Sequence, residues 1–183
     1  MNTFLQQNFE KLHTRDRERQ SQAFDSLIQA SEQPVDWAYE AWDTVVADLR
    51  HPDNLVRAVA AQVLCNLAKS DPEKRILKDF PALLAVTKDE RFVTARHCMQ
   101  ALWKVGVVGE AQKKMLVAGL ASRFSQCITE KNCTLIRYDI LQSLRNVYDV
   151  VKDEKIREMA LELIETENDL KYRKKYESLW KIK

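Results

Sequence analysis

Apolar residues recur every three or four positions along almost the whole chain, and short polar stretches interrupt this pattern. The spacing is typical of amphipathic helices, because residues three or four apart lie on one face of a helix. It predicts ten helices, with boundaries good to about two to four residues. They cover residues 3–12, 16–31, 36–49, 54–69, 72–86, 91–106, 109–128, 133–150, 153–166 and 169–182.

Capping residues support several of these boundaries. Asp71 followed by Pro72 is typical of an N-cap with proline at the first helical position. Four other residues stand at helix starts, where their side-chain oxygens would accept free N–H groups: Asp36, Asn54, Asp153 and Asp169. Nothing between the helices resembles a linker, so we expect a single domain over residues 1–183.

The even-numbered helices repeat one another when they are aligned on an arginine. The aligned residues are Arg57, Arg96, Arg137 and Arg173. The positions three and seven residues later are apolar in every copy: Ala60, Met99, Ile140 and Tyr176, then Leu64, Trp103, Leu144 and Trp180. Each copy would therefore present the same buried stripe. A single helix pair cannot bury such a stripe, which favours stacked repeats.

The clearest copy resembles a known family. Residues 53–57 read Asp-Asn-Leu-Val-Arg, and Ala60, Leu64 and Leu67 follow. This string is similar to the HEAT-repeat pattern of a turn aspartate, then Val-Arg, then small and leucine positions. The first copy departs from the pattern, because it has Gln20 where the arginine is expected.

Two further features extend the resemblance over nearly the whole chain. Asp169 and Arg173 repeat the aspartate-to-arginine spacing, and Pro81 stands where many HEAT first helices carry a kinking proline. The resemblance implies an all-α fold, a right-handed α-α superhelix that forms a HEAT-like solenoid of about five two-helix repeats. It also implies that the even-numbered helices line the concave side.

Composition and charge fit a folded helical protein. The chain is 45% hydrophobic and 31% charged, which provides both a core and a charged surface. Its 3 glycines and 4 prolines are too few for many short strands. The net charge of +2 gives no global field toward nucleic acid or an anionic membrane. The sequence shows neither a secretory signal nor a membrane span, so we expect a cytoplasmic location and no membrane partner.

A second basic column follows the aligned arginines by eight positions. It holds Lys104, Arg145 and Lys181, with Cys65 in the first of these copies. We expect the basic columns and two interleaved glutamines to form a partner-binding surface on the concave side. Its members are Arg96, Gln100, Lys104, Arg137, Gln142, Arg145, Arg173 and Lys181. Such a surface suits an acidic helix or tail of another protein, or a phosphate backbone.

The aligned arginines also have a structural interpretation. By the HEAT resemblance they would pair with turn aspartates such as Asp53 and Asp89 and hold the repeats in register. That interpretation is favoured for the arginines and leaves Lys104 and Arg145 as the better candidates for partner contact.

The last helix carries aromatic residues at four-residue spacing, Tyr172, Tyr176 and Trp180. They would either stack on bases in a basic groove or dock the helix onto the preceding repeat. Docking is the favoured interpretation, because aromatic stripes at helical spacing are usually buried.

The sequence offers no motif for catalysis. His13, His51 and His97 are scattered, and there is no HExxH, glycine-rich phosphate loop or GxSxG. The four cysteines make neither a CxxC pair nor a disulfide framework, so we expect free thiols. A metal cluster of Cys98, Cys127 and Cys133 is a minor alternative. We therefore expect no enzyme, no catalytic residue, no cofactor and no metal.

Two function classes follow from these observations. The leading hypothesis is a non-enzymatic scaffold or adaptor that binds an acidic or helical partner segment on its concave face. The alternative is DNA binding, similar in architecture to the HEAT-like DNA alkylation repair glycosylases. A third resemblance, to the HEAT-like bilin lyases, has no additional residue behind it. The partner and the oligomeric state stay open.

Overall fold

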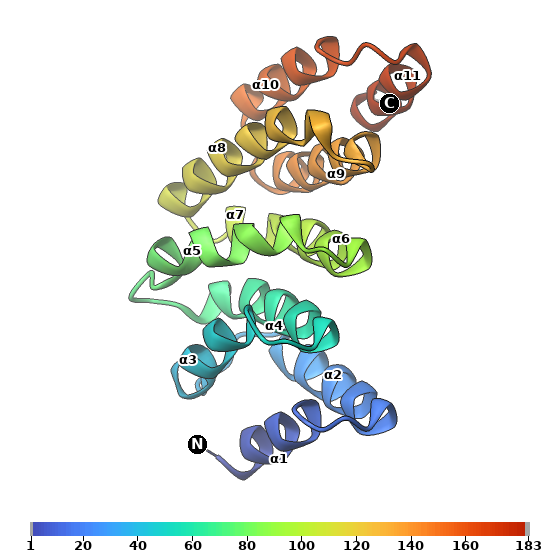
Figure 1. Cartoon of the computed structure of the whole chain (residues 1–183). Coiled ribbons are helices and arrows are strands. Elements are labelled where there is room, and N and C mark those ends of the chain that lie inside the picture. Colours follow the sequence, from blue (N-terminus) through green and yellow to red (C-terminus); the bar gives the residue numbers. More distant parts are fainter. Residues whose placement is uncertain (1, 182–183) are drawn as a thin grey trace. The chain divides into compact units, whose positions relative to one another are not determined.

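The computed structural model describes residues 2–181, and these residues fold as helices joined by short turns, with no strand among them (Figure 1). The helices form two compact units, which meet in the sequence between Val105 and Gly106. The all-helical prediction is confirmed for this part of the chain.

The first unit is built around α4. Its helices are α1 (Thr3–Leu12), α2 (Arg17–Ser31), α3 (Ala38–Asp48), α4 (Asn54–Leu67), α5 (Ile76–Ala85) and α6 (Phe92–Ala101). Short 3₁₀ turns follow two of them, η1 (Ala68–Ser70) and η2 (Val86–Lys88). Because α4 packs against α2, α3 and α6, almost every residue from Val56 to Leu67 is buried. A helix that is apolar on nearly all sides is expected in this position.

The second unit is built around α9. It contains α8 (Glu110–Gln126), the 3₁₀ turn η3 (Cys127–Thr129), α9 (Cys133–Val151), α10 (Glu154–Glu165) and α11 (Leu170–Trp180). The short α7 (Trp103–Gly106) spans the boundary between the units. Helix α9 packs against α8, α10 and α11 and buries Ile136, Ile140 and Leu144 in the core.

The aromatic stripe of α11 docks that helix onto its own unit, which confirms the favoured interpretation. Tyr176 and Trp180 are buried, and the Tyr176 hydroxyl donates a hydrogen bond to the carbonyl oxygen of Thr134. The Trp180 ring lies against Tyr148 of α9, with ring centroids 5.8 Å apart. Tyr176 and Trp180 therefore belong to the core, while Tyr172 is half-exposed.

Aspartate N-caps begin several helices as predicted. The side chains of Asp153 and Asp169 accept N–H groups of the first turns of α10 and α11. Asp53, one residue before the predicted Asn54, caps α4. The prediction for Asp36 was wrong, because α3 begins after Trp37 without a side-chain cap.

The predicted start of the fifth helix at Pro72 was also wrong. The chain makes a turn after Asp71, with Lys74 in the left-handed region at φ 57°, and α5 begins at Ile76. The Asp71 carboxylate still accepts the N–H groups of Arg75 and Ile76. It also accepts the Tyr39 hydroxyl, so the aspartate caps the helix across the turn.

The expectation of four free thiols was wrong for two cysteines. Cys127 in η3 and Cys133 at the start of α9 form a disulfide, because the turn between α8 and α9 places their Cα atoms 5.1 Å apart. The alternative metal cluster that includes both is therefore not formed. Cys65 and Cys98 are free and buried. Burial raises the pKa of the Cys65 thiol to about 12 and also raises that of Cys98.

Candidate functional site

The aligned arginine of α4 is a structural link rather than an open binding group. Arg57 Nε and Nη2 donate to the two carboxylate oxygens of Asp89, at 2.5 and 2.9 Å. Arg57 Nη1 donates to the carbonyl oxygens of His51 and Pro52. Only 13% of the Arg57 side chain and 5% of the Asp89 side chain are exposed. The pair thus joins the start of α4 to the turn before α6.

Charge at this link is set by opposing effects. Burial acts to raise the pKa of Asp89, but the hydrogen bonds from Arg57 and from the Arg91 N–H outweigh it and lower that pKa. The Asp89 bond raises the pKa of Arg57 against the effect of burial. Both groups are therefore charged at neutral pH, and the charge of each stabilises the charged form of the other.

The same link recurs elsewhere with different residues. In the first unit, the buried Gln20 donates to Asp53 Oδ2 at 3.1 Å, and Arg17 beside it also reaches Asp53. In the second unit, Arg137 Nη1 donates to Glu167 Oε2 at 2.9 Å. In each case a residue near the start of one α-helix bonds to an acidic residue in the turn before the second α-helix that follows it in the chain. Gln20 departs from the sequence pattern, but it makes the same kind of link to an acidic turn residue that the arginines make.

Two of the predicted partner-binding residues, Arg137 and Arg173, are tied into the second unit. The Arg137 guanidinium is buried, lies 4.6 Å from the centroid of the Phe124 ring and donates to the Phe124 carbonyl. Arg173 donates to the carbonyl oxygens of Glu165 and Glu167. The donors of both arginines thus bond to groups of the second unit itself.

Arg145, one of the better candidates for partner contact by sequence, is also held inside its unit. Its Nε donates to both oxygens of Asp149 at 2.9 Å, and its Nη1 donates to the Leu179 carbonyl. The guanidinium lies 5.7 Å from the centroid of the Trp180 ring. Only 22% of the side chain is exposed. Arg145 thus clamps α11 onto α9.

The other predicted residues are distributed over both units. Gln142 is half-buried and donates to Asn146 of the same helix. Lys181 is exposed just after α11, and Gln100 is exposed on α6. Arg96 is half-buried, with its guanidinium 6.0 Å from the centroid of the Phe92 ring. Within either unit, these residues are not gathered into one binding site.

Lys104 belongs to a polar chain that joins the ends of three helices of the first unit. Its Nζ donates to Asn66 Oδ1 at 2.6 Å. Asn66 Nδ2 in turn donates to Ser31 Oγ at 2.9 Å, and Ser31 Oγ donates to the Leu27 carbonyl. Asn66 and Ser31 are buried, so the lysine ammonium is held in a fixed place at the edge of the core.

A second lysine stands at the same place. Lys69 Nζ donates to the carbonyl oxygens of Ser31 and Glu32, at 3.3 and 2.6 Å. Burial lowers the pKa of Lys69, and the positive charge of Lys104 lowers it further. Lys69 and Lys104, called the lysine pair below, therefore place two like charges beside the C-terminal ends of α2 and α4, and their mutual repulsion favours a bound anion.

Sequence reasoning missed Lys69 and Asn66. A signal for Asn66 exists, since it is a polar residue within the apolar string Leu64-Cys65-Asn66-Leu67, and such residues need a hydrogen-bonding partner when buried. Lys69 carries no such signal. It joins the site only because the 3₁₀ turn η1 folds it back toward the end of α2.

Comparison with known proteins identifies a similar fold and no family. No family model matches the chain, and no curated protein matches it. Among solved structures, the crystal structure of an engineered protein is similar, with a TM-score of 0.60 and 17% sequence identity. The match covers 98% of this chain and 80% of that one. At this identity the likeness concerns the fold alone.

Two structural features are absent from residues 2–181. No helix there is both long enough and apolar enough to cross a bilayer. No group of three or more histidine, cysteine, aspartate or glutamate residues is placed to hold a metal ion within that range. Among the predicted site residues, Lys104 has a second cation beside it and an ammonium group held in place by a hydrogen bond.

Proposed function

We propose that this chain is a non-enzymatic interaction module, a HEAT-like helical-repeat scaffold that binds an acidic segment of another protein. The resemblance to HEAT repeats supports the architecture, as do the recurring links of Gln20, Arg57 and Arg137 to acidic turn residues. Stacked helical repeats offer extended surfaces for partners.

The lysine pair is the observation that carries the proposal. Each ammonium has three N–H donors, and the bonds described above occupy two at Lys69 and one at Lys104. A carboxylate that approaches both lysines relieves their mutual repulsion and gains charge-assisted hydrogen bonds. Because Lys104 is already fixed by Asn66, little side-chain entropy is lost when the partner binds.

The test replaces both lysines by glutamine. Lys69→Gln with Lys104→Gln removes the two charges but keeps a side-chain N–H donor at each position, and the melting temperature of the double variant checks that the fold is kept. Proteins captured from the source cell by the wild type are identified, and their acidic segments are made recombinantly for binding measurements. We expect the double variant to lose at least about tenfold in affinity for such a segment, since each lost charge contact costs on the order of 1 kcal/mol or more.

Lys78→Gln is the matched control, because Lys78 is exposed on α5 of the same unit. Its affinity should equal that of the wild type. Equal binding by the double variant, with an unchanged melting temperature, would falsify the proposal. Binding to duplex DNA that weakens steeply with salt, without binding to an acidic segment, would replace the proposal by the nucleic-acid alternative.

A further inference from the structure

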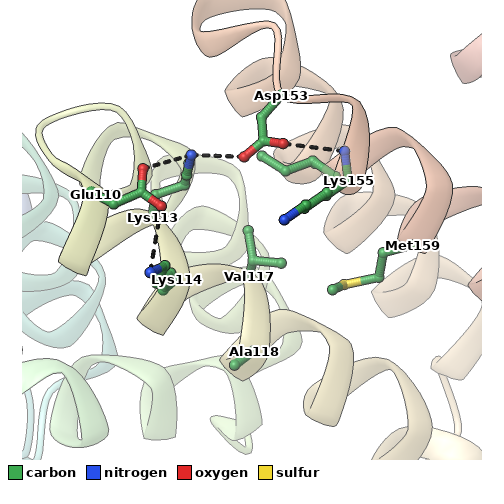
Figure 2. A pocket seen from close by; sticks show the side chains of 9 residues that line it. Glu110, Lys113, Lys114, Val117, Ala118, Asp153, Lys155 and Met159 are labelled. Carbon is green, nitrogen blue, oxygen red and sulfur yellow. Dashed lines mark hydrogen bonds and ion pairs between the residues drawn. The ribbon is translucent and has the colours of Figure 1, made fainter.

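A pocket of about 320 Å³ opens between α8 and α10 of the second unit (Figure 2). Four residues give it an apolar floor: Val117, Ala118, Ile156 and Met159. Charged residues form its rim: Glu110, Lys113, Lys114, Asp153 and Lys155. All of these residues belong to the second unit. The pocket that they line is called the α8–α10 groove below.

The hollow follows from side-chain size. Ala118 lines the pocket from an exposed position on α8 and offers only a single methyl group there. Val117 and Ile156 are buried below it, while Met159 is half-buried and points toward Val117 (Figure 2). The volume is about twice that of the roughly 150 Å³ apolar cavity known to hold a benzene ring. One large aromatic or aliphatic side chain would therefore fit.

One lysine of the rim is part of the wall. Lys113 Nζ bonds to Asp153 Oδ2 and lies within 2.7 Å of Glu110 Oε2, and 15% of its side chain is exposed. Asp153 also accepts the N–H of Lys155 as the N-cap of α10. Lys113 thus ties the start of α10 to α8, and both neighbouring carboxylates are used by this link.

The other two lysines are available to a ligand. Lys114 is 76% exposed, and its Nζ lies 3.9 Å from Glu110, a loose contact. The Lys155 ammonium reaches toward the middle of the pocket near Val117 (Figure 2). It has no hydrogen-bond or ion-pair partner among residues 2–181. The apolar floor is therefore flanked by one cation from α8 and one from α10.

We propose that the α8–α10 groove binds an acidic amphipathic segment of a partner protein. One large apolar side chain of the segment enters the pocket, and carboxylates on either side of it bond to Lys114 and Lys155. The inference rests on the proposed function, because it names a second place where the same class of partner would be held.

Placement of the charges favours a peptide as the occupant. The two lysines stand on different helices, Lys114 at the α8 edge and Lys155 reaching in from α10 near Val117, so they match two carboxylates of one amphipathic segment. A fatty acid has one carboxylate at one end and would leave one of the lysines unpaired. A nucleic acid strand would leave the apolar floor without a partner. An amphipathic helix supplies both features at spacings of three and four residues.

The experiment is a selection from a randomised 16-residue peptide library displayed on phage, with the full chain immobilised. We expect enriched peptides to carry a large apolar residue with aspartate or glutamate three or four positions away. A synthetic copy of one enriched peptide then serves as the probe in fluorescence anisotropy. Absence of enrichment, or enrichment without acidic residues, would refute the proposal.

Three variants test the site itself. Ala118→Trp fills the pocket from an exposed position, and Lys155→Glu reverses one flanking charge, so each should lower the affinity for the probe at least about tenfold. Lys171→Glu is the matched control, since Lys171 is exposed on α11, and it should leave the affinity within about twofold. A probe with lysine in place of its glutamates should bind Lys155→Glu better than the wild type does. Unchanged affinity in Ala118→Trp and Lys155→Glu overturns the assignment.

The outcome separates this inference from the proposed function. If the lysine-pair variant loses its partner while Ala118→Trp and Lys155→Glu bind the probe as the wild type does, the groove assignment fails and the proposed function stands. If the groove variants lose the probe while the lysine pair has no effect on any acidic segment, the groove is the site and the lysine pair is not.

Discussion

Arg57 and Asp89 lie 32 residues apart, yet the guanidinium of one meets both carboxylate oxygens of the other. Both side chains are almost fully buried, so the pair joins two elements where water competes little. Buried pairs of this kind add little compared with an apolar replacement of both partners. Their removal one at a time is costly, because an uncompensated charge is left behind.

Arg57→Ala should therefore destabilise the chain by about 3 kcal/mol, the lower end of what loss of one partner of a buried pair costs. Asp89→Ala should cost a similar amount, and the double variant should cost much less than the two losses together. Urea unfolding monitored by circular dichroism measures this. The control is Lys78→Ala on the exposed face of α5, which should change stability by less than about 0.5 kcal/mol. Additive losses at Arg57 and Asp89 would contradict a direct coupling.

Acid should destabilise the fold through the same carboxylates. The pKa of Asp89 is lowered in the folded state, as are those of Asp53 and Glu167. A carboxyl group with a depressed folded-state pKa contributes stability above its unfolded pKa and loses it as pH falls through the folded value. We expect the free energy of unfolding to fall steadily below about pH 4.5, where unfolded carboxyl groups begin to bind protons. In Asp89→Asn the fall should be shallower, and an identical slope would show that Asp89 does not contribute.

Gln20 tests whether the link depends on charge. Its side-chain amide donates to the Leu12 carbonyl and to Asp53, and the residue is fully buried. Gln20→Ala should cost roughly 2 kcal/mol, because it leaves a cavity and buried acceptors without donors. Gln20→Glu should cost more, since a second carboxylate would face Asp53. Thermal unfolding of the two variants decides the order, and a more stable Gln20→Glu would exclude the described geometry.

Much of the fold was predictable because the residues that a helix buries on one face recur every three or four positions, and this spacing is visible in the sequence. The predicted boundaries of the second helix and of the ninth differ from α2 (Arg17–Ser31) and α10 (Glu154–Glu165) by one residue at most at each end. The start of α5 was missed by four residues, because Asp71 caps the helix from across a turn rather than from the adjacent position. Tertiary contact from Tyr39 holds that turn, and no local pattern records it.

The candidate site was less predictable. The sequence shows where basic residues recur, but whether the charged group of such a residue is free depends on the groups that the neighbouring helix places beside it. Arg145 finds the Leu179 carbonyl and Asp149, whereas Lys155 finds no side-chain partner within residues 2–181. The Cys127–Cys133 disulfide was missed for a similar reason, since a spacing of six gives no standard motif until the turn closes it.

Arg145 should behave as a stability residue. Arg145→Glu would place a carboxylate beside Asp149 and the Leu179 carbonyl, so we expect a melting temperature several degrees lower. The Arg145→Lys variant should be intermediate, because lysine keeps the charge but not the two-sided geometry. Differential scanning calorimetry measures both. An unchanged melting temperature in Arg145→Glu would show that Arg145 does not stabilise the fold and would again make it a candidate for partner binding.

The Cys127–Cys133 disulfide should stabilise the turn between α8 and α9 by a modest amount. The bond closes a short loop, with a sequence separation of 6, and loop-closure entropy for such a ring corresponds to about 2 kcal/mol. The Cys127→Ala, Cys133→Ala double variant should lose about that much in urea unfolding. Dithiothreitol should lower the wild type to the same value and leave the double variant unchanged, because Cys65 and Cys98 are already free thiols. Equal sensitivity of both proteins to the reductant would show that the bond contributes nothing to folding stability.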